Sequence, residues 1–540
     1  MATVETPTNE PVQSYAPGSA ERRRLQRALS DLREAAPREL PMHIGGRRVE
    51  GTATTLPVRA PHQHALELGR AAQATVADAH AAVDAALAAS REWSHTTLEE
   101  RAAIFLRAAE LLSGPWRDRM NAATILGQSK SVYQAEIDAA CELIDFWRFN
   151  VHFAFRLRED QPLSSKGVWN RTELRPLEGF VVAITPFNFT SIAGNLPTAP
   201  ALMGNTVVWK PSVTSMLAAS TIMELLEEAG LPPGVINMVT GHGAGVLDAA
   251  ISHPSLAGIH FTGSTDTFRG LWRQVAGNLD GYRTYPRLVG ETGGKDFVIA
   301  HESASPEALL VGLLRGAFEY QGQKCSAASR AYVPRRLWEE LRGPFAQATE
   351  AISMGDPADF STFMGAVIDE RAFRKHEAAL RAATHDPALQ VVAGGECDDS
   401  VGWFVRPTII ATDHPHHDLM ERELFGPILT VHPYDCEWEQ ALRLVDETSP
   451  YGLTGAVFAT ERRAIETGMR VLRQAAGNFY VNDKPTGAVV GQQPFGGARQ
   501  SGTNDKAGSA LNLLRWASAR SIKETLVPAT EWRYPHLDPD

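Results

Sequence analysis

Residues 180–212 read FVVAITPFNFTSIAGNLPTAPALMGNTVVWKPS, and this segment sets the fold class. It holds the first two of four apolar runs with strand character, which are Phe180–Thr185, Thr206–Trp209, Val235–Val239 and Gly258–Thr262. Helix-like stretches such as Met216–Ala229 separate these runs. Strands that alternate with helices predict parallel pairing with crossover helices, and therefore an open α/β sheet. Ligands bind such sheets at the carboxyl ends of the strands, so we expect the chemistry there.

The same α/β pattern returns over residues 291–480 and predicts a second α/β domain. Its strand-like runs are Phe297–Ala300, Ala331–Val333, Gly455–Phe458 and Phe479–Val481, with helices expected at 306–318 and 337–352. Upstream, residues 76–92 and 98–112 also have helical patterns.

The N-terminus begins with a polar stretch. Residues 1–19 are rich in Pro, Ser and Thr, and we expect them to lack fixed structure. Leu25, Leu29 and Leu32 then recur at helical spacing and predict an amphipathic helix that packs on the body of the protein. A mitochondrial transit helix is the alternative, which the acidic residues Asp31 and Glu34 disfavour.

Two strand-like segments fit neither domain. Lys166–Arg175 alternates like a strand, and Ile522–Val527 is another short run near the C-terminus. Because a lone exposed strand promotes aggregation, we interpret residues 161–179 and 506–540 as an arm and tail that pair with another subunit.

The composition limits the class of protein. The chain has 540 residues, with 52 Lys+Arg against 63 Asp+Glu, so the net charge is −11. An acidic chain is a poor nucleic-acid binder. The sequence has no secretory signal and no apolar run of about 18 residues, so we expect no membrane span. Four cysteines in this length do not form a disulfide framework, which indicates a reducing compartment, the cytoplasm or, in a eukaryote, the mitochondrial matrix.

Polar side chains follow three of the predicted strands. Asn188 could donate an amide hydrogen to a developing oxyanion, although an Asn in a turn more often satisfies backbone groups. Lys210 could meet a phosphate or a ribose hydroxyl, or simply be solvated. The segment Phe261-Thr-Gly-Ser-Thr265 opens a helix, whose N-terminal N–H groups suit a pyrophosphate.

Cys325 is the candidate nucleophile. It lies in Gln321-Gly-Gln-Lys-Cys-Ser326, downstream of Glu291-Thr-Gly-Gly-Lys295, and we expect the neighbouring Lys324 to favour its thiolate. A single Cys is more often a small buried apolar residue, which is how we interpret Cys141, Cys397 and Cys436. The cluster His414-Pro-His-His417 lacks further ligands in a metal-binding pattern, so we assign no metal.

Together these segments resemble the aldehyde dehydrogenase superfamily over about residues 40 to 527. Glu291 precedes Cys325 by 34 positions, as the base precedes the nucleophile in that superfamily. Glu423-Leu-Phe-Gly-Pro427 and Pro494-Phe-Gly-Gly497 are similar to two further elements of its active site. Residues 318–330 and 482–506 are similar to the branch of 1-pyrroline-5-carboxylate dehydrogenases.

The resemblance implies a fold and a reaction. Residues 1–160 and 180–290 are expected to form a Rossmann-type NAD-binding domain, and residues 291–505 the catalytic domain. The implied reaction is the NAD-dependent oxidation of L-glutamate γ-semialdehyde, the open form of a cyclic imine, to L-glutamate in proline degradation. The implied assembly is a homodimer or a larger oligomer built from dimers, with proline dehydrogenase as a further candidate partner.

The resemblance also assigns roles. Cys325 is the nucleophile, Asn188 and the Cys325 N–H form the oxyanion hole, and Glu291 activates the water that hydrolyses a thioester. The implied NAD contacts are Thr185, Lys210, Gly263, Ser264, Thr265, Asp266, Thr267 and Glu423. The implied substrate contacts are Phe189, Lys324, Ser326, Gly487, Ala488 and Phe495.

Three positions depart from the family pattern. Val213 replaces a Glu that grips the adenosine ribose in many members, and Phe268 replaces a turn Gly, so we expect a weaker hold on the adenosine half and some use of NADP. Ala488 removes a side-chain hydroxyl at the carboxylate anchor. An alternative function is the oxidation of another small semialdehyde, such as succinate semialdehyde. A binding protein without turnover is disfavoured by the intact Cys325, Glu291 and Asn188.

Overall fold

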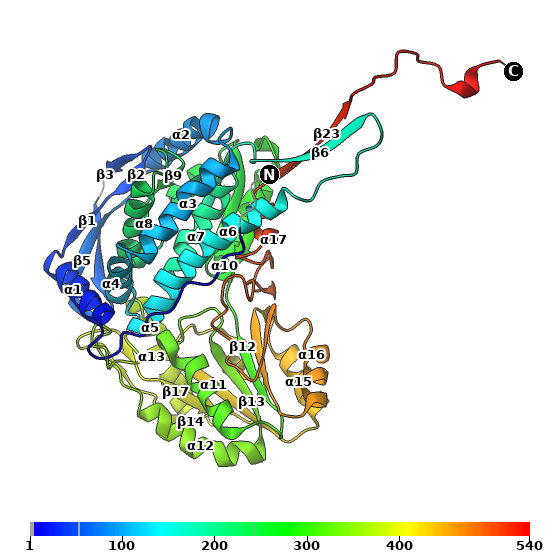
Figure 1. Cartoon of the computed structure of the whole chain (residues 1–540). Helices are drawn as coiled ribbons and strands as arrows, with labels where there is room; N and C mark the ends of the chain where they lie inside the picture. The colour runs from blue at the N-terminus through cyan, green and yellow to red at the C-terminus, as the bar shows by residue number, and fades with distance from the viewer. Residues whose placement is uncertain (1–4, 52–53, 242–243, 540) are drawn as a thin grey trace.

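A computed structural model describes residues 5–51, 54–241 and 244–539 of the chain. Two seven-stranded sheets form the cores of two lobes (Figure 1). The first has the order β11-β10-β7-β8-β9-β2-β3, in which the first five strands are parallel. Its strands are β2 (Met42–Ile44), β3 (Arg47–Val49), β7 (Phe180–Ile184), β8 (Thr206–Lys210), β9 (Ile236–Met238), β10 (Leu256–Thr262) and β11 (Arg287–Glu291).

Alternate residues of the central strands face two separate cores, which is why these strands read as continuous apolar runs. Val181 and Ala183 of β7 pack with one set of helices, and Val182 and Ile184 pack with the other. The first set is α3 (Leu98–Ser113), α4 (Arg117–Gln128), α6 (Leu143–Leu157), α7 (Thr190–Leu202) and α8 (Met216–Glu228). The second is α2 (Val76–Trp93), α9 (Ala244–Ile251) and α10 (Thr265–Gly277). The open α/β sheet is therefore confirmed.

The second sheet has the order β14-β17-β18-β13-β12-β20-β21 and is parallel except for β14. Its strands are β12 (Asp296–Ala300), β13 (Ala328–Pro334), β14 (Gln390–Ala393), β17 (Thr408–Ala411), β18 (Ile428–Tyr434), β20 (Thr454–Phe458) and β21 (Asn478–Val481). Its helices are α11 (Pro306–Phe318), α12 (Arg335–Glu350), α13 (Glu370–His385), α15 (Trp438–Thr448) and α16 (Arg462–Val471). Each strand and helix expected in this region is present.

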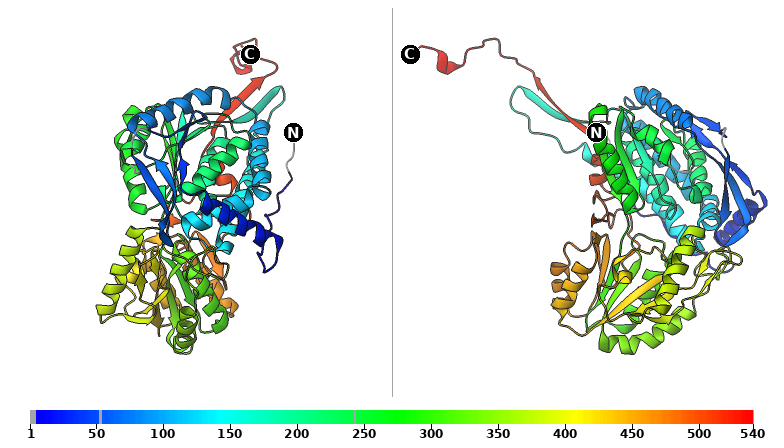
Figure 2. Two further views of the ribbon diagram at one scale, coloured as in Figure 1. Left: turned by 90° about the vertical axis from the view of Figure 1, so that its left-hand side faces the viewer. Right: turned by 180° about the vertical axis from the view of Figure 1, so that it is seen from behind.

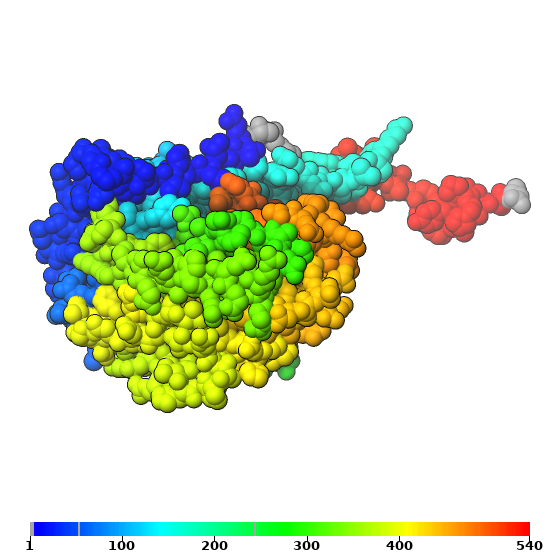
Figure 3. Space-filling view, turned by 90° about the horizontal axis from the view of Figure 1, so that it is seen from below, coloured from blue at the N-terminus to red at the C-terminus, as the bar shows by residue number. Residues whose placement is uncertain are grey.

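A two-stranded ribbon projects from the body. β6 (Val168–Arg175) pairs antiparallel with β23 (Ser518–Thr525), and the C-terminal tail continues beyond it (Figures 1 and 2). Figure 3 shows the ribbon and the tail extending away from the rounded body. The arm is shorter than we expected, because residues 506–517 belong to the body. There α17 (Ala510–Leu514) and the two residues after it bury Leu513 and Trp516 in the core of the first lobe.

The N-terminal residues differ most from expectation. Helix α1 (Ala20–Glu34) buries Leu25 and Leu29, as its spacing predicts. Residues 5–15 do not lack structure, however: they run without helix or strand along α4 and α6 and make hydrogen bonds there. We call residues 5–15 the N-terminal strap. Residues 1–4 lie outside the described part of the chain. Among the described residues, no helix is long and apolar enough to cross a membrane.

Three small sheets and several short elements complete the fold. A three-stranded sheet joins β1 (Arg38–Leu40), β5 (Gln63–Ala72) and β4 (Thr55–Ala60). β15 (Cys397–Asp398) pairs with β16 (Phe404–Val405), and β19 (Tyr451–Gly452) pairs with β22 (Ala498–Arg499). Short helices lie at α5 (Val132–Ala135) and α14 (Asp418–Glu421), and a π-helix spans Glu136–Glu142 between α5 and α6.

Candidate active site

A cavity of about 310 Å³ contains the candidate catalytic thiol and carboxylate. Cys325 and Glu291 both line it, although they lie on different lobes, after η4 (Glu319–Gly322) and at the end of β11. The predicted substrate contacts line the same cavity: Phe189, Lys324, Ser326, Gly487, Ala488 and Phe495. The predicted NAD contacts do not line it.

The loop that carries Cys325 is held by its own glutamines. Gln321 has positive φ (55°) and donates from Nε2 to the carbonyls of Ser129 (2.9 Å) and Ala366 (2.8 Å). Gln323 accepts the N–H of Ile368 on its side-chain oxygen at 2.9 Å. These bonds fix a left-handed turn immediately before the thiol. Nothing in the motif Gln321-Gly-Gln-Lys-Cys-Ser326 indicates this structural role of its glutamines.

Asn188 lies against the same turn. It is buried between β7 and α7, and its Nδ2 donates to the Gln323 carbonyl at 3.0 Å. The amide is thus held two residues from Cys325, where its second N–H hydrogen remains available to an oxyanion.

The surroundings of Cys325 favour the neutral thiol. Burial raises the pKa of Cys325 well above its ordinary value, and the carboxylates of Asp296, Glu291 and Glu423 raise it further. The expectation that Lys324 favours the thiolate is wrong: Lys324 Nζ donates to Glu319 Oε2 at 3.1 Å, and its charge is compensated there. The thiol therefore needs a base to remove its proton.

Glu291 is the carboxylate placed to act as that base. Burial raises the pKa of Glu291 well above 4.5, while the Gly497 N–H and the ammonium of Lys506 lower it and Asp505 raises it. Its Oε2 has no hydrogen-bond partner among the described residues. A carboxylate with a raised pKa and a free oxygen is suited to accept a proton from a thiol or from water.

Polar groups gather at the end of the cavity that the sequence assigns to the substrate's amino-acid group. The hydroxyls of Ser326 and Thr486 lie 2.7 Å apart, and Gly487 follows with φ +93°, a conformation that suits glycine. Thr486 was not predicted. Thr486 and Ser326 are 160 residues apart in the chain, so the sequence did not indicate that they are in contact.

A further missed residue is Glu142, at the end of the π-helix. π-helical turns are frequent at functional sites, and this one carries the acidic residues Glu136, Asp138 and Glu142. Glu142 lines the cavity and accepts a hydrogen bond from Ser191 Oγ at 2.9 Å. Burial, and next the charge of Asp138, raise the pKa of Glu142 to about 8. A π-turn cannot be predicted from an amphipathic pattern, so the sequence did not indicate that Glu142 belongs to the site.

Phe189 is placed by a buried ion pair. Lys130 Nζ lies 2.6 Å from Asp138 Oδ2 and 4.1 Å from the centre of the Phe189 ring. Asp138 also accepts the N–H groups of Thr190 and Ser191 (both 2.9 Å) at the start of α7. The Asp138 carboxylate therefore holds the N-terminus of α7. This fixes Phe189, the residue before the helix, at the cavity wall.

The predicted cofactor contacts gather at the carboxyl ends of the first sheet. From β7 the chain runs through β8 and β9 on one side and then returns to β10 on the other side of β7, so the strand order reverses beside these strand ends. Thr185 accepts Trp209 Nε1–H at 2.9 Å, and Lys210 is the last residue of β8, with its side chain partly buried. Ser264 caps α10 by accepting the N–H of Thr267 at 3.2 Å, while Asp266 is almost fully exposed.

Gly263 and Glu423 complete this predicted set. At Gly263 a Cβ atom would lie 2.7 Å from the Phe261 ring, so no side chain fits. Thr265 Oγ1 donates to the Gln500 carbonyl at 3.4 Å, and Glu423 Oε1 accepts the N–H of Gly294 at 2.9 Å. Burial raises the pKa of Glu423.

Phe268 faces inward, away from the end of the helix. Its ring stacks on Phe261 (centres 5.3 Å apart) and fills the space over Gly290, where a Cβ atom would lie 2.1 Å from it. The residue that replaces the usual turn glycine thus packs in the core between α10, β10 and β11. Val213, in η2 (Val213–Ser215), is partly exposed.

Among the described residues, no group of three or more His, Cys, Asp or Glu could hold a metal ion.

Comparison with known proteins identifies the class. The sequence profile of the aldehyde dehydrogenase family matches residues 49–521, and the chain belongs to this family. It is 51% identical over 532 residues to the mitochondrial Δ1-pyrroline-5-carboxylate dehydrogenase of Mus musculus, a match that covers 98% of this chain and 94% of the mouse protein.

Solved structures agree with the sequence relatives. The Δ-pyrroline-5-carboxylate dehydrogenase of Mycobacterium tuberculosis bound with NAD is 59% identical, with a TM-score of 0.96 over 100% of this chain and 99% of the other. Proline utilization A from Bdellovibrio bacteriovorus is 28% identical with a TM-score of 0.91, over 96% of this chain and 53% of that longer chain.

Proposed function

We propose that this chain oxidises L-glutamate γ-semialdehyde to L-glutamate with NAD. The observation that carries the proposal is one cavity in which the Cys325 thiol and the Glu291 carboxyl face a polar end formed by Ser326, Thr486 and Gly487. The names of the mouse and mycobacterial relatives support the same substrate.

The ends of β7, β8 and β10 suit a dinucleotide. The N–H groups at the start of α10, with the Ser264 cap, fit a pyrophosphate, and Gly263, where no side chain fits, permits close approach of the backbone. Lys210 and Glu423 are placed to hold ribose hydroxyls. NAD, when bound, supplies the acceptor for the hydride that the aldehyde carbon loses.

The residues of the cavity divide the reaction into two halves. In the first, Glu291 accepts the thiol proton of Cys325 directly or through water, and Sγ bonds to the aldehyde carbon. The N–H groups of Asn188 and Cys325 stabilise the resulting oxyanion. Loss of hydride leaves a thioester on Cys325. Before the second half, Glu291 releases the thiol proton to solvent. It then removes a proton from water, whose oxygen attacks the thioester carbon. The C–S bond breaks, glutamate leaves, and the Cys325 thiolate takes up the proton held by Glu291.

The far end of the cavity selects the amino-acid group. The hydroxyls of Ser326 and Thr486 and the backbone N–H groups of Gly487 and Ala488 are donors for the α-carboxylate. The Glu142 carboxylate is a candidate partner for the α-ammonium group, because a nearby cation favours its ionised form. Phe189 and Phe495 line the path of the aliphatic chain.

A substrate panel tests the proposal. We expect kcat/KM for L-glutamate γ-semialdehyde to exceed that for succinate semialdehyde by at least about 100-fold, because the shorter substrate lacks the α-ammonium group and leaves buried polar groups unpaired. The measurement is NADH formation at 340 nm. Equal values for the two aldehydes would favour the second candidate, a general small-semialdehyde dehydrogenase.

The same assay with NADP tests cofactor choice. Val213 offers no carboxylate to repel a 2′-phosphate, and residues 213–216 contain no Arg or Lys to bind one. We expect NAD to be preferred and NADP to give slow but measurable turnover. Faster turnover with NADP at equal concentration contradicts this assignment.

The assembly and location belong to the same proposal. The exposed ribbon of β6 and β23 is the candidate contact of a homodimer. The likeness to part of a longer proline utilization A chain supports proline dehydrogenase as a candidate partner. A reducing compartment, the cytoplasm, suits an enzyme whose Cys325 must remain a thiol. The mouse relative is named as mitochondrial.

A further inference from the structure

The N-terminal strap forms one wall of the cavity. Asn9, Glu10 and Val12 line it together with Cys325 and Gly487, although more than 300 residues separate them in the chain. Loops and termini seldom hold a fixed path unless buried groups anchor them. The strap has two such anchors.

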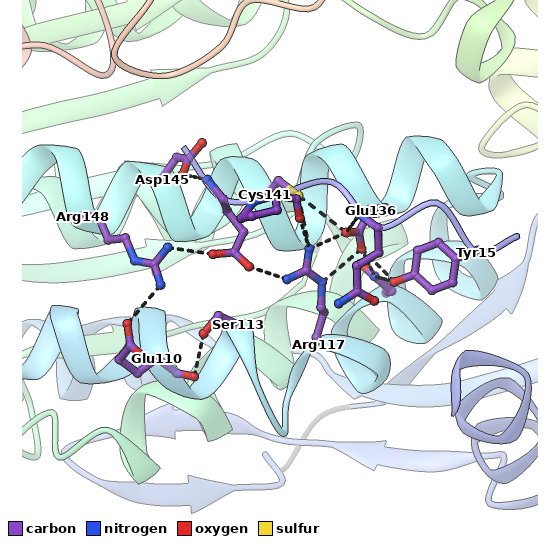
Figure 4. A network of polar contacts seen from close by, with 12 residues as sticks. Tyr15, Glu110, Ser113, Arg117, Glu136, Cys141, Asp145 and Arg148 are labelled. Carbon is purple, nitrogen blue, oxygen red and sulfur yellow. Dashed lines mark hydrogen bonds and ion pairs between the residues drawn. The ribbon is translucent and has the colours of Figure 1, made fainter. Parts of the chain in front are cut away.

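The first anchor is Tyr15. Its side chain is 4% exposed, and its hydroxyl donates to Glu136 Oε2 at 2.8 Å (Figure 4). Glu136 begins the π-helix and also accepts the Gln13 N–H at 2.8 Å and a bond from Arg117. Burial raises the pKa of Glu136, but the bonds from Arg117 and the strap outweigh it and lower the pKa overall, so the anchor is ionised at neutral pH.

The second anchor is Glu10. Its two carboxylate oxygens accept Arg117 NH1 at 2.5 Å and Arg148 NH1 at 2.7 Å, and its backbone N–H donates to Asp145 Oδ1 at 2.8 Å. Arg117 NH2 also donates to the Pro11 carbonyl at 2.9 Å. Figure 4 shows Arg117, Arg148 and Asp145 of α4 and α6 converging on this place. The strap is thus clamped on both sides of Pro11.

Asn9 extends from this clamp to the loop that presents the substrate's carboxylate donors. Its Nδ2 donates to the Val490 carbonyl at 2.7 Å and to Asp145 Oδ2 at 2.8 Å. Its Oδ1 accepts Gln492 Nε2–H at 2.8 Å. One amide group therefore joins helix α6, the strap and residues 490–492.

In the loop between Thr486 and Val490, the Val489 N–H donates to Gln493 Oε1 at 3.0 Å, and the Val489 carbonyl accepts the N–H groups of Gln492 (3.0 Å) and Gln493 (2.9 Å). Among the described hydrogen bonds, none involves Gly487 or Ala488. Ser326 holds Thr486 at one end, and Val490 packs on Phe146 and Phe149 at the other. Gly487 between them has φ +93°, and Val489 is exposed. Backbone donors bind well only when the loop is fixed before the ligand arrives.

We propose that Asn9 is a positioning residue that fixes residues 487–490 for the carboxylate of the substrate. The inference rests on the proposed function, because it needs a substrate with an α-carboxylate end group. Asn9 acts through the loop and touches no reacting atom.

The test compares Asn9→Ala with Thr8→Ala, a matched control at the exposed neighbouring position. We expect Asn9→Ala to raise KM for L-glutamate γ-semialdehyde roughly 3- to 10-fold, the effect of about one hydrogen bond, and the inhibition constant of the product L-glutamate by a similar factor. The kcat value, and kcat/KM for propanal, which has no end group, should stay within about twofold. Gln492→Ala, which removes only the bond to Asn9 Oδ1, should change KM in the same direction by less.

The outcomes separate the two proposals. If the unmodified enzyme shows no preference for the semialdehyde over succinate semialdehyde, the proposed function fails. If the preference is present but Asn9→Ala leaves both KM and the glutamate inhibition constant unchanged, the inference about Asn9 is overturned. Equal loss of kcat/KM on the semialdehyde and on propanal, with a lowered melting temperature, assigns Asn9 a purely structural role and also overturns it.

Discussion

The pKa of Glu291 depends on burial and on the charged and polar groups around its carboxyl. Its pKa is raised by burial and by Asp505, and lowered by the Gly497 N–H and by Lys506. Lys506 Nζ donates to the carbonyls of Gly477 (2.8 Å) and Gly496 (2.9 Å), so its charge is held beside the loop on which Glu291 rests. At Gly496 a Cβ atom would lie 2.9 Å from Glu291 Oε1.

The position of Lys506 leads to a prediction about pH dependence. The basic form of Glu291 increases as the pH rises through its raised pKa, so kcat should increase with pH on the acid side. Lys506→Met removes a nearby positive charge and should raise this pKa further. We expect the acid limb of the kcat profile to move to higher pH, with kcat at pH 7 reduced by about tenfold.

The control is Lys506→Arg, which keeps the charge and should keep the limb near that of the unmodified enzyme. The measurement is kcat with L-glutamate γ-semialdehyde and NAD between pH 5 and 9. An acid limb that stays in place or moves to lower pH in Lys506→Met shows that this charge does not act on Glu291.

The ribbon of β6 and β23 is the element that we propose as the contact between two subunits. Trp169 on β6 and Leu526, Val527 and Trp532 in the tail are all more than half exposed. A two-stranded ribbon is marginally stable by itself, and exposed apolar groups of this size indicate an interface. We expect a chain ended after Ala517, which keeps Trp516 in the core, to be a monomer.

Light scattering after size exclusion measures this effect. One full-length chain has a mass of 58.8 kDa, so the full-length protein should have about twice this mass or a larger even multiple of it. The shortened protein should have the mass of one shortened chain. A full-length protein that is monomeric at micromolar concentration contradicts the proposed role of the ribbon.

Eight of the fourteen strands of the two central sheets were predicted, and β2, β3, β11, β14, β17 and β18 were not. β7 and β8 appear as apolar runs because both faces of a parallel strand are buried, and α11 starts at Pro306 after the N-cap Ser305. The π-helix at Glu136–Glu142 has no such signal. The strap was missed because its polar composition is typical of disorder, while its order comes from charges on α4 and α6 that are distant in the sequence.

The candidate catalytic residues were chosen for a different reason. Cys325, Glu291 and Asn188 stand in motifs whose order and spacing resemble a family, and the structure brings them to one place. The partner of Lys324 could not be predicted, because an ion pair with Glu319 depends on the turn at Tyr320 and Gln321. Thr486 and Glu142 join the site only through the packing of whole domains.

At the scale of the molecule, the site exists because two lobes meet. Glu291 ends a strand of the first sheet, Cys325 precedes a strand of the second, and the chain returns through residues 486–507 to close the cavity between them. In the proposed mechanism Cys325 forms the thioester, whereas Glu291 assists by accepting the thiol proton and is essential only for hydrolysis of the thioester.

The most direct test is a stopped-flow measurement of NADH formation with L-glutamate γ-semialdehyde, NAD and enzyme at tens of micromolar. Cys325→Ala should release no NADH in any phase. Glu291→Gln should release a burst of one equivalent per site, because water or buffer can slowly remove the thiol proton, followed by turnover slowed about 10²- to 10⁴-fold. Multiple turnovers by Cys325→Ala, or no burst from Glu291→Gln at any pH, would contradict this division of the two tasks.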